Sequence, residues 1–155
     1  MTDDTSSPID IPSSKSPFFT INAQYVKDLS YENPNIPGLV QLQTEPSIEV
    51  NIDVKATKLD DNLYEVVLSL TCKGISADVA LFVAELSYAS LVSLNNVPDE
   101  QIQKVLVVDC PTLMFPFARN IIAEITSDGG YPPILMQVVD FKAIFENGVN
   151  DIKGT

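Results

Sequence analysis

The sequence predicts an α+β fold in which a four-stranded antiparallel sheet is followed by three helices packed on one face. Two observations support this fold class. Four stretches with the two-residue periodicity of β-strands lie before residue 93, and every helical signal comes after them. Strands followed by helices, instead of alternating with them, are typical of an α+β domain.

The first two predicted strands span residues 19–25 and 47–55. The second alternates four apolar residues with polar ones, so we expect one wet face. The connection between the strands includes residues 31–38, whose two prolines and glycine exclude regular structure. In the first strand every second residue is apolar or aromatic. We therefore expect one side of this strand to carry Phe19, Ile21, Ala23 and Tyr25.

The third and fourth predicted strands span residues 63–73 and 78–92, with a short connection as in an antiparallel pair. The fourth is apolar on both sides, and its odd positions include Leu81, Val83 and Leu91. Three short helices cover about one face of such a sheet, and each of these side chains left in water forgoes about 1.5 to 3 kcal/mol. We therefore expect another subunit to cover the second face.

Three helices are predicted, over residues 98–110, 116–128 and 140–147. The first begins with a proline and two acids, as first helical turns favour, and we expect Cys110-Pro111 to end it. A proline opens the second helix and a pair of glycines stops it. An aspartate can cap the third, which stops before a glycine.

The chain divides into a disordered acidic arm (residues 1–17), one folded domain (18–148) and a short flexible tail (149–155). The arm lacks the basic start and apolar centre of an export signal, and no run approaches the roughly 18 apolar residues of a membrane span. These features favour a soluble, cytoplasmic protein. Cys72 and Cys110 suggest no disulfide framework and are expected to be buried thiols.

The composition argues against an enzyme. The chain contains no histidine, which excludes catalytic triads, histidine-ligated metals and histidine acid–base steps. No phosphate-binding glycine motif is present, so nucleotide use is not expected, and we predict no cofactor and no metal. The acid pairs Asp60-Asp61 and Asp99-Glu100 are better explained as a turn and a helix start.

The net charge of the chain limits the kinds of partner that we expect. Twenty-one acids against nine bases give a net charge of −12, and the acids are spread along the chain. Nucleic acid is not an expected partner, because phosphate binding needs clustered Lys and Arg. A basic protein partner fits such a surface, although acidity also serves solubility alone.

Five motifs, in order from about residue 18 to 148, resemble those of the SecB family of protein-export chaperones. Each is short, but five in the matching order and spacing make the resemblance specific. They are residues 24–37 (Gln-Tyr-Val-Lys-Asp-Leu-Ser-Tyr-Glu-Asn-Pro-Asn-Ile-Pro), 63–68 (Leu-Tyr-Glu-Val-Val-Leu), 110–119 (Cys-Pro-Thr-Leu-Met-Phe-Pro-Phe-Ala-Arg), 129–133 (Gly-Gly-Tyr-Pro-Pro) and 141–145 (Phe-Lys-Ala-Ile-Phe).

The resemblance implies an ATP-independent chaperone that binds unfolded secretory precursors, keeps them competent for translocation and delivers them to the motor protein SecA. It implies a homotetramer assembled as a dimer of dimers, with sheets facing each other across the contact between dimers. It implies neither nucleic-acid binding nor direct membrane insertion. Many members carry a longer tail that adds a second SecA contact, and the resemblance does not extend to that contact.

The resemblance also implies three sets of site residues. The SecA-docking set is Asp28, Glu32, Val83 and Glu85. The groove for unfolded chains, between the apolar loop after the first strand and the second helix, has as candidates Tyr31, Leu39, Leu42, Phe115, Ile121, Ile125 and Tyr131. The tetramer contact has Ala84, Leu86 and Tyr88. Each groove residue fits a place in the core equally well, and Asp28 and Glu32 fit solvated turn positions equally well.

Three other functions remain open at this point. A SecB-like chaperone can be dedicated to one client, such as the antitoxin of a toxin–antitoxin system, although the retained docking acids argue against it. The chain can also be a structural adaptor that binds no unfolded chains. A small enzyme with an unrecognised carboxylate site is disfavoured by the missing histidines and cofactor loops.

Overall fold

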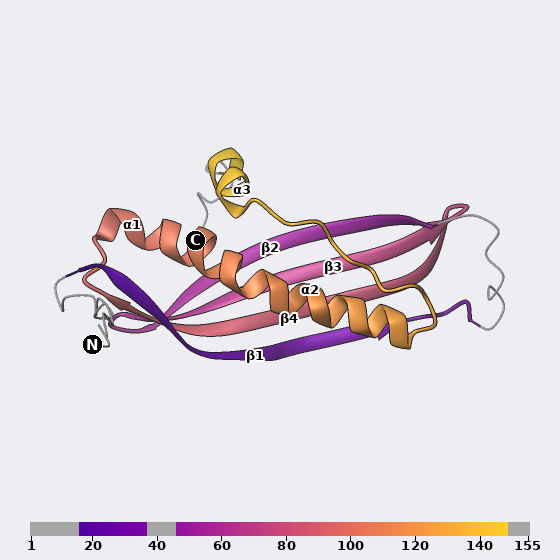
Figure 1. Cartoon of the computed structure of the whole chain (residues 1–155), viewed down its shortest axis with the longest axis horizontal. Coiled ribbons are helices and arrows are strands. Elements are labelled where there is room, and N and C mark those ends of the chain that lie inside the picture. The colour runs from indigo at the N-terminus through magenta and orange to yellow at the C-terminus, as the bar shows by residue number, and fades with distance from the viewer. Residues whose placement is uncertain (1–15, 37–45, 149–155) are drawn as a thin grey trace, which may run out of the picture.

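The four predicted strands are present and form one antiparallel sheet in the order β1-β4-β3-β2 (Figure 1). Every strand is longer than its predicted span, because ladder pairing continues past the residues whose side chains alternate. The structure is a computed structural model and describes residues 16–36 and 46–148. The strands are β1 (Phe18–Glu32), β2 (Ser47–Asp60), β3 (Leu63–Ser76) and β4 (Val79–Asn95).

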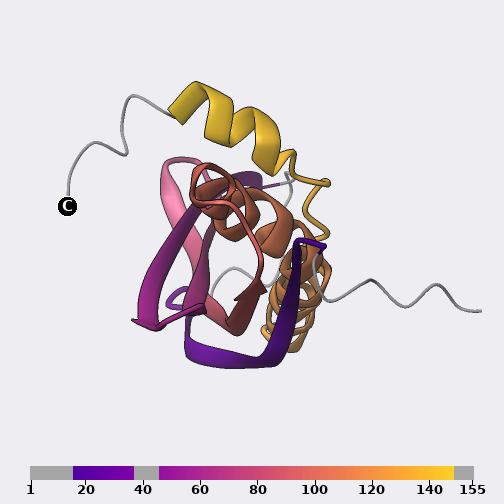
Figure 2. The ribbon, with the colours of Figure 1, turned by 90° about the vertical axis from the view of Figure 1, so that its left-hand side faces the viewer.

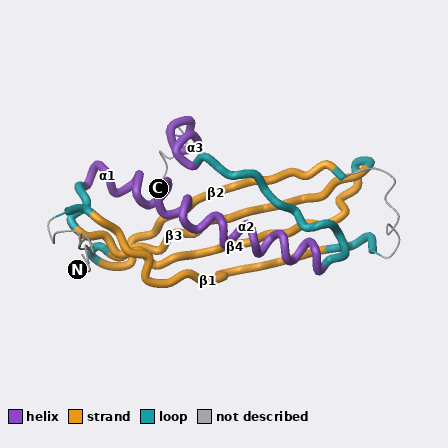
Figure 3. Tube along the Cα trace, viewed as in Figure 1, coloured by secondary structure: helices purple, strands orange, loops and turns teal. Residues whose placement is uncertain are grey.

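The helical part differs from the three predicted helices. Helix α1 (Asp99–Lys104), the π-helical segment η1 (Val105–Asp109) and α2 (Cys110–Asp128) follow one another without a break, as the long diagonal helix of Figure 3. The predicted break at Cys110-Pro111 was therefore wrong, as was a new helix start at Pro116. The predicted last helix is present as α3 (Phe141–Gly148).

Local geometry and packing explain how this helix tolerates its prolines. The wider π turn lies just before Pro111, whose ring would otherwise clash with the carbonyl of the preceding turn. The Thr112 hydroxyl donates a hydrogen bond to the Val108 carbonyl oxygen at 2.6 Å. Pro116 lies inside α2 and costs about 3 kcal/mol in a helix interior. Burial of the α2 residues Met114, Ala118 and Ile122 against the sheet offsets that cost.

All the helices lie on one side of the curved sheet (Figure 2). The core lies between them and the even-numbered positions of the two central strands, and the side chains there are almost fully buried. From β3 and β4 these are Val66, Leu68, Leu70, Cys72, Phe82, Ala84, Leu86, Tyr88, Val92 and Leu94. The opposite face of the sheet is covered by no helix that the structure describes (Figure 2).

Strand β1 departs from simple alternation at two β-bulges, where Asn22 and Lys27 have no partner in the ladder with β4. Each bulge inserts one extra residue, so the positions after it exchange faces. The predicted common face of the first strand was therefore wrong beyond Ile21. Phe19 and Ile21 pair with inward-facing positions of β4, whereas Ala23 and Tyr25 pair with outward-facing ones.

The continuous helix Asp99–Asp128 passes a length and composition test for a membrane span. It has 30 residues, and its most apolar window has a mean hydropathy of 1.4. Because 44% of that window is buried inside the fold, the helix is explained by its place in the core.

Gly74 offers a test of this core. It is the ladder partner of Phe82, and a Cβ at Gly74 would overlap the fully buried Phe82 ring. We expect Gly74→Ala to lower the free energy of unfolding by about 1 to 3 kcal/mol, because overpacking forces neighbouring side chains out of their rotamers. Urea denaturation followed by circular dichroism measures the change.

Gly148→Ala is the matched control, because nothing lies within 4 Å of an added Cβ there. It should not lower the free energy of unfolding. Equal stabilities of the two variants would contradict the tight contact between β3 and the Phe82 ring.

Candidate binding surfaces

The four residues predicted to dock SecA lie together on the uncovered face of the sheet. Glu32 on β1 pairs with Val83 on β4, and Asp28 lies four residues earlier on β1, facing the same side. Glu85 of β4 lies between Glu32 and Asp28 along the sheet, where the Ser30 hydroxyl donates to its carboxylate at 3.4 Å. The three acids are exposed, and none forms an ion pair within the described residues. The structure thus brings the set together as a negative cluster, while its role stays a prediction.

The middle of the same face is flat. At the positions between the acidic cluster and the far edge of the sheet, β3 carries Ser69 and Thr71, and β4 carries Ser87 and Ala89. Short side chains at Ser69, Thr71 and Ser87 leave no ridge beside the acidic cluster. A flat face with a charged end is suited to a protein partner rather than to a small ligand.

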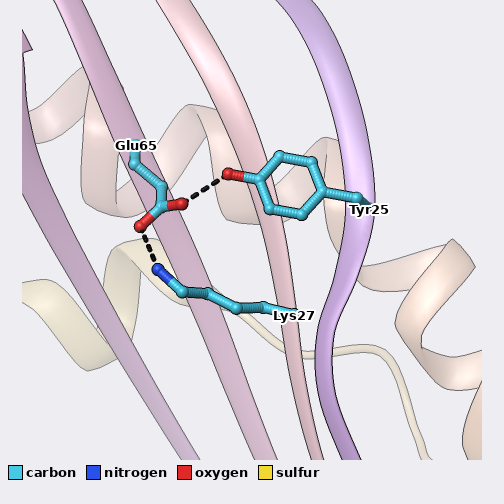
Figure 4. A network of polar contacts seen from close by, with 3 residues as sticks. All are labelled: Tyr25, Lys27 and Glu65. Atoms are coloured by element: carbon cyan, nitrogen blue, oxygen red, sulfur yellow. Dashed lines mark hydrogen bonds and ion pairs between the residues drawn. The ribbon is translucent and has the colours of Figure 1, made fainter.

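A polar network spans three strands of this face (Figure 4). The Tyr25 hydroxyl donates to Glu65 Oε2, and Lys27 Nζ lies 2.6 Å from Glu65 Oε1. The hydrogen bond from Lys27, followed by that from Tyr25, lowers the pKa of Glu65. The same carboxylate, through its hydrogen bond and then with burial, raises the pKa of Tyr25 to about 12. Lys27 therefore balances the charge of Glu65 and leaves the acidic cluster as the negative part of the face.

The three residues predicted for the tetramer contact lie in the chain's own core, so that prediction was wrong. Ala84, Leu86 and Tyr88 are 0%, 2% and 7% exposed. They are even-numbered positions of β4, which face the helices. A charged substitution there would disrupt the fold instead of separating subunits.

The outward face of β4 also lacks the apolar surface that sheet-to-sheet contact requires. Leu81 is fully buried within the chain, at a bulge where it has no partner in β3. Val83 and Leu91 are half-buried. Their neighbours on this face are mostly small or charged, so the expected cover by another subunit has little apolar area to bury.

Exposed apolar residues gather on the helical side instead. Leu113 and Phe117, four residues apart on α2, are 52% and 54% exposed. Leu135 and Val138, in the segment after α2, are 62% and 90% exposed. The Arg119 Nε group donates to the Met136 carbonyl oxygen at 2.7 Å and holds that segment against α2. The near-continuous apolar run of residues 113–118 was the sequence signal for a helix with two apolar sides.

The predicted groove set divides into four groups. Tyr31 and Tyr131 flank the Phe82 ring, with centroid distances of 6.1 and 5.0 Å. On α2, Ile121 and Ile125 are half-buried beside the core. Leu39 and Leu42 lie outside the described residues. Phe115 belongs to the core: it is 4% exposed and packs edge-on against Phe141.

The aromatic group is tied to the end of α2. Asn33 Nδ2 donates to the Gly129 carbonyl oxygen at 2.8 Å, and the Tyr131 hydroxyl donates to Asn33 Oδ1 at 3.2 Å. The Tyr31 hydroxyl is buried and has no hydrogen-bond partner among the described residues, and burial raises the pKa of its phenol. The start of the loop after β1 is therefore fastened beside α2, while the groove between them stays a prediction.

Two hollows that the sequence did not reveal follow the inner side of β2. The larger, of about 550 Å³, lies beside Tyr64 and Ile102, and the smaller, of about 200 Å³, lies beneath α3. Val54 and Val107 line both, so the two hollows are neighbours. The alternation of β2 predicted an apolar face. It did not predict that the helices would leave this face partly uncovered. The smaller hollow is also lined by Ile52, Asp53, Phe141, Ile144, Phe145 and Gly148.

Reactive chemistry has little support in these surfaces. Within residues 16–36 and 46–148, no group of three His, Cys, Asp or Glu side chains could hold a metal ion. Both cysteines are buried thiols, and burial, together with Asp109, raises the pKa of Cys110 to about 12. A thiol that stays protonated is a poor nucleophile.

Comparison with known proteins points to one family. The family model described as preprotein translocase subunit SecB matches residues 12–151. A protein-export protein SecB of Hyphomonas neptunium is 48% identical over 133 residues, covering 84% of this chain and 78% of that protein. The SecB of Sphingopyxis alaskensis is 39% identical over 160 residues, covering 99% and 93%.

A solved structure shares the fold. A SecB-like chaperone of Mycobacterium tuberculosis, in complex with a peptide from an antitoxin, matches with a TM-score of 0.65 over 78% of this chain and 90% of its own. The identity is 11%, so this likeness concerns the fold alone.

Proposed function

Because this chain belongs to the SecB family, we propose that it is an ATP-independent chaperone that holds unfolded secretory precursors competent for translocation and delivers them to SecA. The observation that carries the proposal is the family match over residues 12–151. The family is one of export chaperones and not a known enzyme family. We place the activity in the cytoplasm, where precursors are held before export.

Client binding is supported by apolar surface on the helical side. The hollows along β2 and the half-buried Ile121 and Ile125 of α2 offer apolar surface. An unfolded chain exposes side chains that gain about 1.5 to 3 kcal/mol each on burial, before ordering costs. Several weak contacts along one extended chain add up to tight binding without a nucleotide cycle.

Docking of SecA is assigned to the acidic cluster of Asp28, Glu32 and Glu85, with Val83 among them. The cluster is exposed, has no ion-pair partner in the described residues and borders a flat face. Clients and SecA would then bind opposite sides of the sheet, so one need not displace the other.

A homotetramer, built as a dimer of dimers, has two supporting features. Strand β1 is a 15-residue edge strand, and exposed edges readily pair with a second chain. Leu113, Phe117, Leu135 and Val138 expose apolar surface on the helical side. Two different contacts per subunit are what a dimer of dimers needs.

A chaperone dedicated to an antitoxin is the second candidate. The Mycobacterium tuberculosis structure is a SecB-like chaperone with an antitoxin peptide, but its identity to this chain is 11%. The relatives at 39% and 48% identity are export proteins. The general export function is therefore the better supported one, and an adaptor without client binding has no supporting observation.

We expect Ile144→Asp and Ile125→Ser to weaken binding of an unfolded precursor about tenfold each, because each removes apolar contact from the helical side, worth about 1.4 kcal/mol. Isothermal titration with unfolded precursor measures the affinity. Wild-type binding should show a negative heat-capacity change and should not depend on ATP.

The matched control for client binding is Leu59→Ser, which changes an exposed apolar residue at the end of β2, outside the residues that line the hollows. It should bind as wild type does. Equal affinity for the folded precursor, or a requirement for ATP, would refute the chaperone assignment.

We expect Glu85→Lys, and more mildly Asp28→Lys or Glu32→Lys, to weaken SecA binding, because charge reversal acts on a complementary docking face. Unfolded-chain binding should not change. Added salt should weaken the wild-type complex in the same direction. Surface plasmon resonance with immobilised SecA at two salt concentrations measures both effects.

Glu124→Lys is the control for docking, since it reverses an exposed acid on α2, on the other side of the sheet. It should leave SecA affinity nearly unchanged. If all three cluster reversals also leave the affinity unchanged at low salt, the docking assignment is wrong.

Light scattering coupled to size exclusion should report about four times the chain mass of 16.9 kDa. Phe117→Arg should shift the assembly towards dimers, because it places a charge in the exposed apolar face of α2. Val79→Arg, at an exposed apolar position in the β3–β4 turn region, should keep the wild-type mass. A monomer at micromolar concentration is the result that contradicts the tetramer.

A further inference from the structure

The acidic cluster exists because of the bulge at Lys27. With this extra residue, Asp28 pairs with Ser87 on the outward face, and Leu29 pairs with Leu86 in the core. If the ladder continued from the Tyr25–Ala89 pair without a bulge, Asp28 would lie opposite Leu86. The carboxylate would then lie on the helical side of the sheet, where Leu29 now stands 39% exposed, and would be lost from the outward face. The docking surface therefore depends on the backbone at residues 26–28.

The polar network of Tyr25, Lys27 and Glu65 is built on this bulge. Lys27 is the extra residue itself, and its Nζ reaches across β4 to Glu65 on β3. Tyr25 lies two residues before it and donates to the same carboxylate (Figure 4). The bulge residue and a residue just before it are thus anchored to one carboxylate on β3, a strand that does not pair with β1.

The sequence on β4 makes room for this crossing. Tyr25 pairs with Ala89, whose small side chain is fully buried although it lies on the uncovered face. Glu65 is also shielded, with its side chain 15% exposed. A larger residue at position 89 would stand between the phenol and the carboxylate.

The other bulge of β1 follows the same plan. Its extra residue, Asn22, donates from Nδ2 to Ser93 Oγ at 2.6 Å. Both extra residues of β1 are therefore held by a side-chain bond to another strand. Register itself is secured by apolar residues such as Ile21 and Tyr31, which pack against the core, so the network at Lys27 acts on local conformation.

We propose that Tyr25, Lys27 and Glu65 are positioning residues for SecA docking: they fix the bulge so that Asp28 stands in line with Glu85 and Glu32. This inference rests on the proposed function, because it assumes that the acidic cluster is the docking surface. It assigns a role in binding to a lysine whose charge opposes that of the surface around it.

Because the charge of Lys27 is opposite to that of the acidic cluster, a charge role and a positioning role predict opposite changes in SecA affinity. If Lys27 acted only through its charge, Lys27→Met would make the face more negative and strengthen the binding of a basic partner surface. A positioning role predicts the reverse, a loss of about threefold to tenfold in affinity, which lies within the range for residues in contact. Tyr25→Phe changes no charge, so charge alone predicts no effect, whereas positioning predicts a loss.

The experiment measures SecA affinity for the full chain and four variants: Lys27→Met, Tyr25→Phe, the conservative Lys27→Arg and the swapped pair Lys27→Glu with Glu65→Lys. We expect the first two to bind more weakly and Lys27→Arg to bind as wild type does. The swapped pair retains both charges and the contact between them, so it should recover most of the affinity that Lys27→Met loses.

Tyrosinate absorbance reports the network independently of SecA. The Glu65 carboxylate holds the pKa of Tyr25 at about 12, so Glu65→Gln should bring one tyrosine back towards an ordinary pKa near 10. Unfolded-chain binding should be unchanged in every variant, because none of these residues lines the helical side. That measurement also shows that the variants are folded.

Glu85→Lys separates failure of this inference from failure of the proposed function. If Glu85→Lys weakens SecA binding while Lys27→Met strengthens it or leaves it unchanged, the positioning role is overturned and the docking surface stands. If Glu85→Lys has no effect either, the docking surface itself is wrong. Should Lys27→Met fail to fold, Tyr25→Phe decides, and its wild-type affinity would overturn the inference.

Discussion

The burial of one face of β3 and β4 beneath a single long helix is the interaction on which the rest of the structure depends. Even-numbered residues of both strands contact one continuous apolar layer that includes Met114, Ala118 and Ile122. A helix long enough to cross the whole sheet must accommodate Pro111 and Pro116, and the π-helical turn of η1 solves the first of these problems. Packing on the sheet, rather than helix propensity, keeps this helix whole.

Covering one face only leaves the molecule with two different surfaces. The uncovered face is flat, polar and negative at one end, whereas the helical side exposes apolar residues and two hollows beside β2. Charge suits recognition of a folded partner, and apolar hollows suit unfolded chains. Under the proposed function, the sheet would separate a client-binding side from a docking side.

Strand β1 links the two surfaces, and its bulges determine what each surface displays. Asn22 and Lys27 each reverse the side-chain alternation, which sends Phe19, Ile21, Leu29 and Tyr31 inward and the acids outward. An edge strand with two bulges bends strongly, and its start lies against α1 and η1, where Phe19 and Val105 line one hollow. The same irregularities that shape the acidic cluster thus also close one end of the core.

The sequence by itself determined the four strands, their antiparallel arrangement and the family, because side-chain alternation and short motifs are local signals. It also selected the acids Asp28, Glu32 and Glu85, which the sheet brings together. Tertiary structure decided which apolar set of β4 is inside: alternation defines two sets, but only the position of the helix shows that Ala84, Leu86 and Tyr88 are core. It also carried the helix through Cys110-Pro111, since a proline signal weighs less than burial along a whole sheet. The bulges of β1 and the hollows beside β2 depend on partners far apart in the chain, so no local pattern could reveal them.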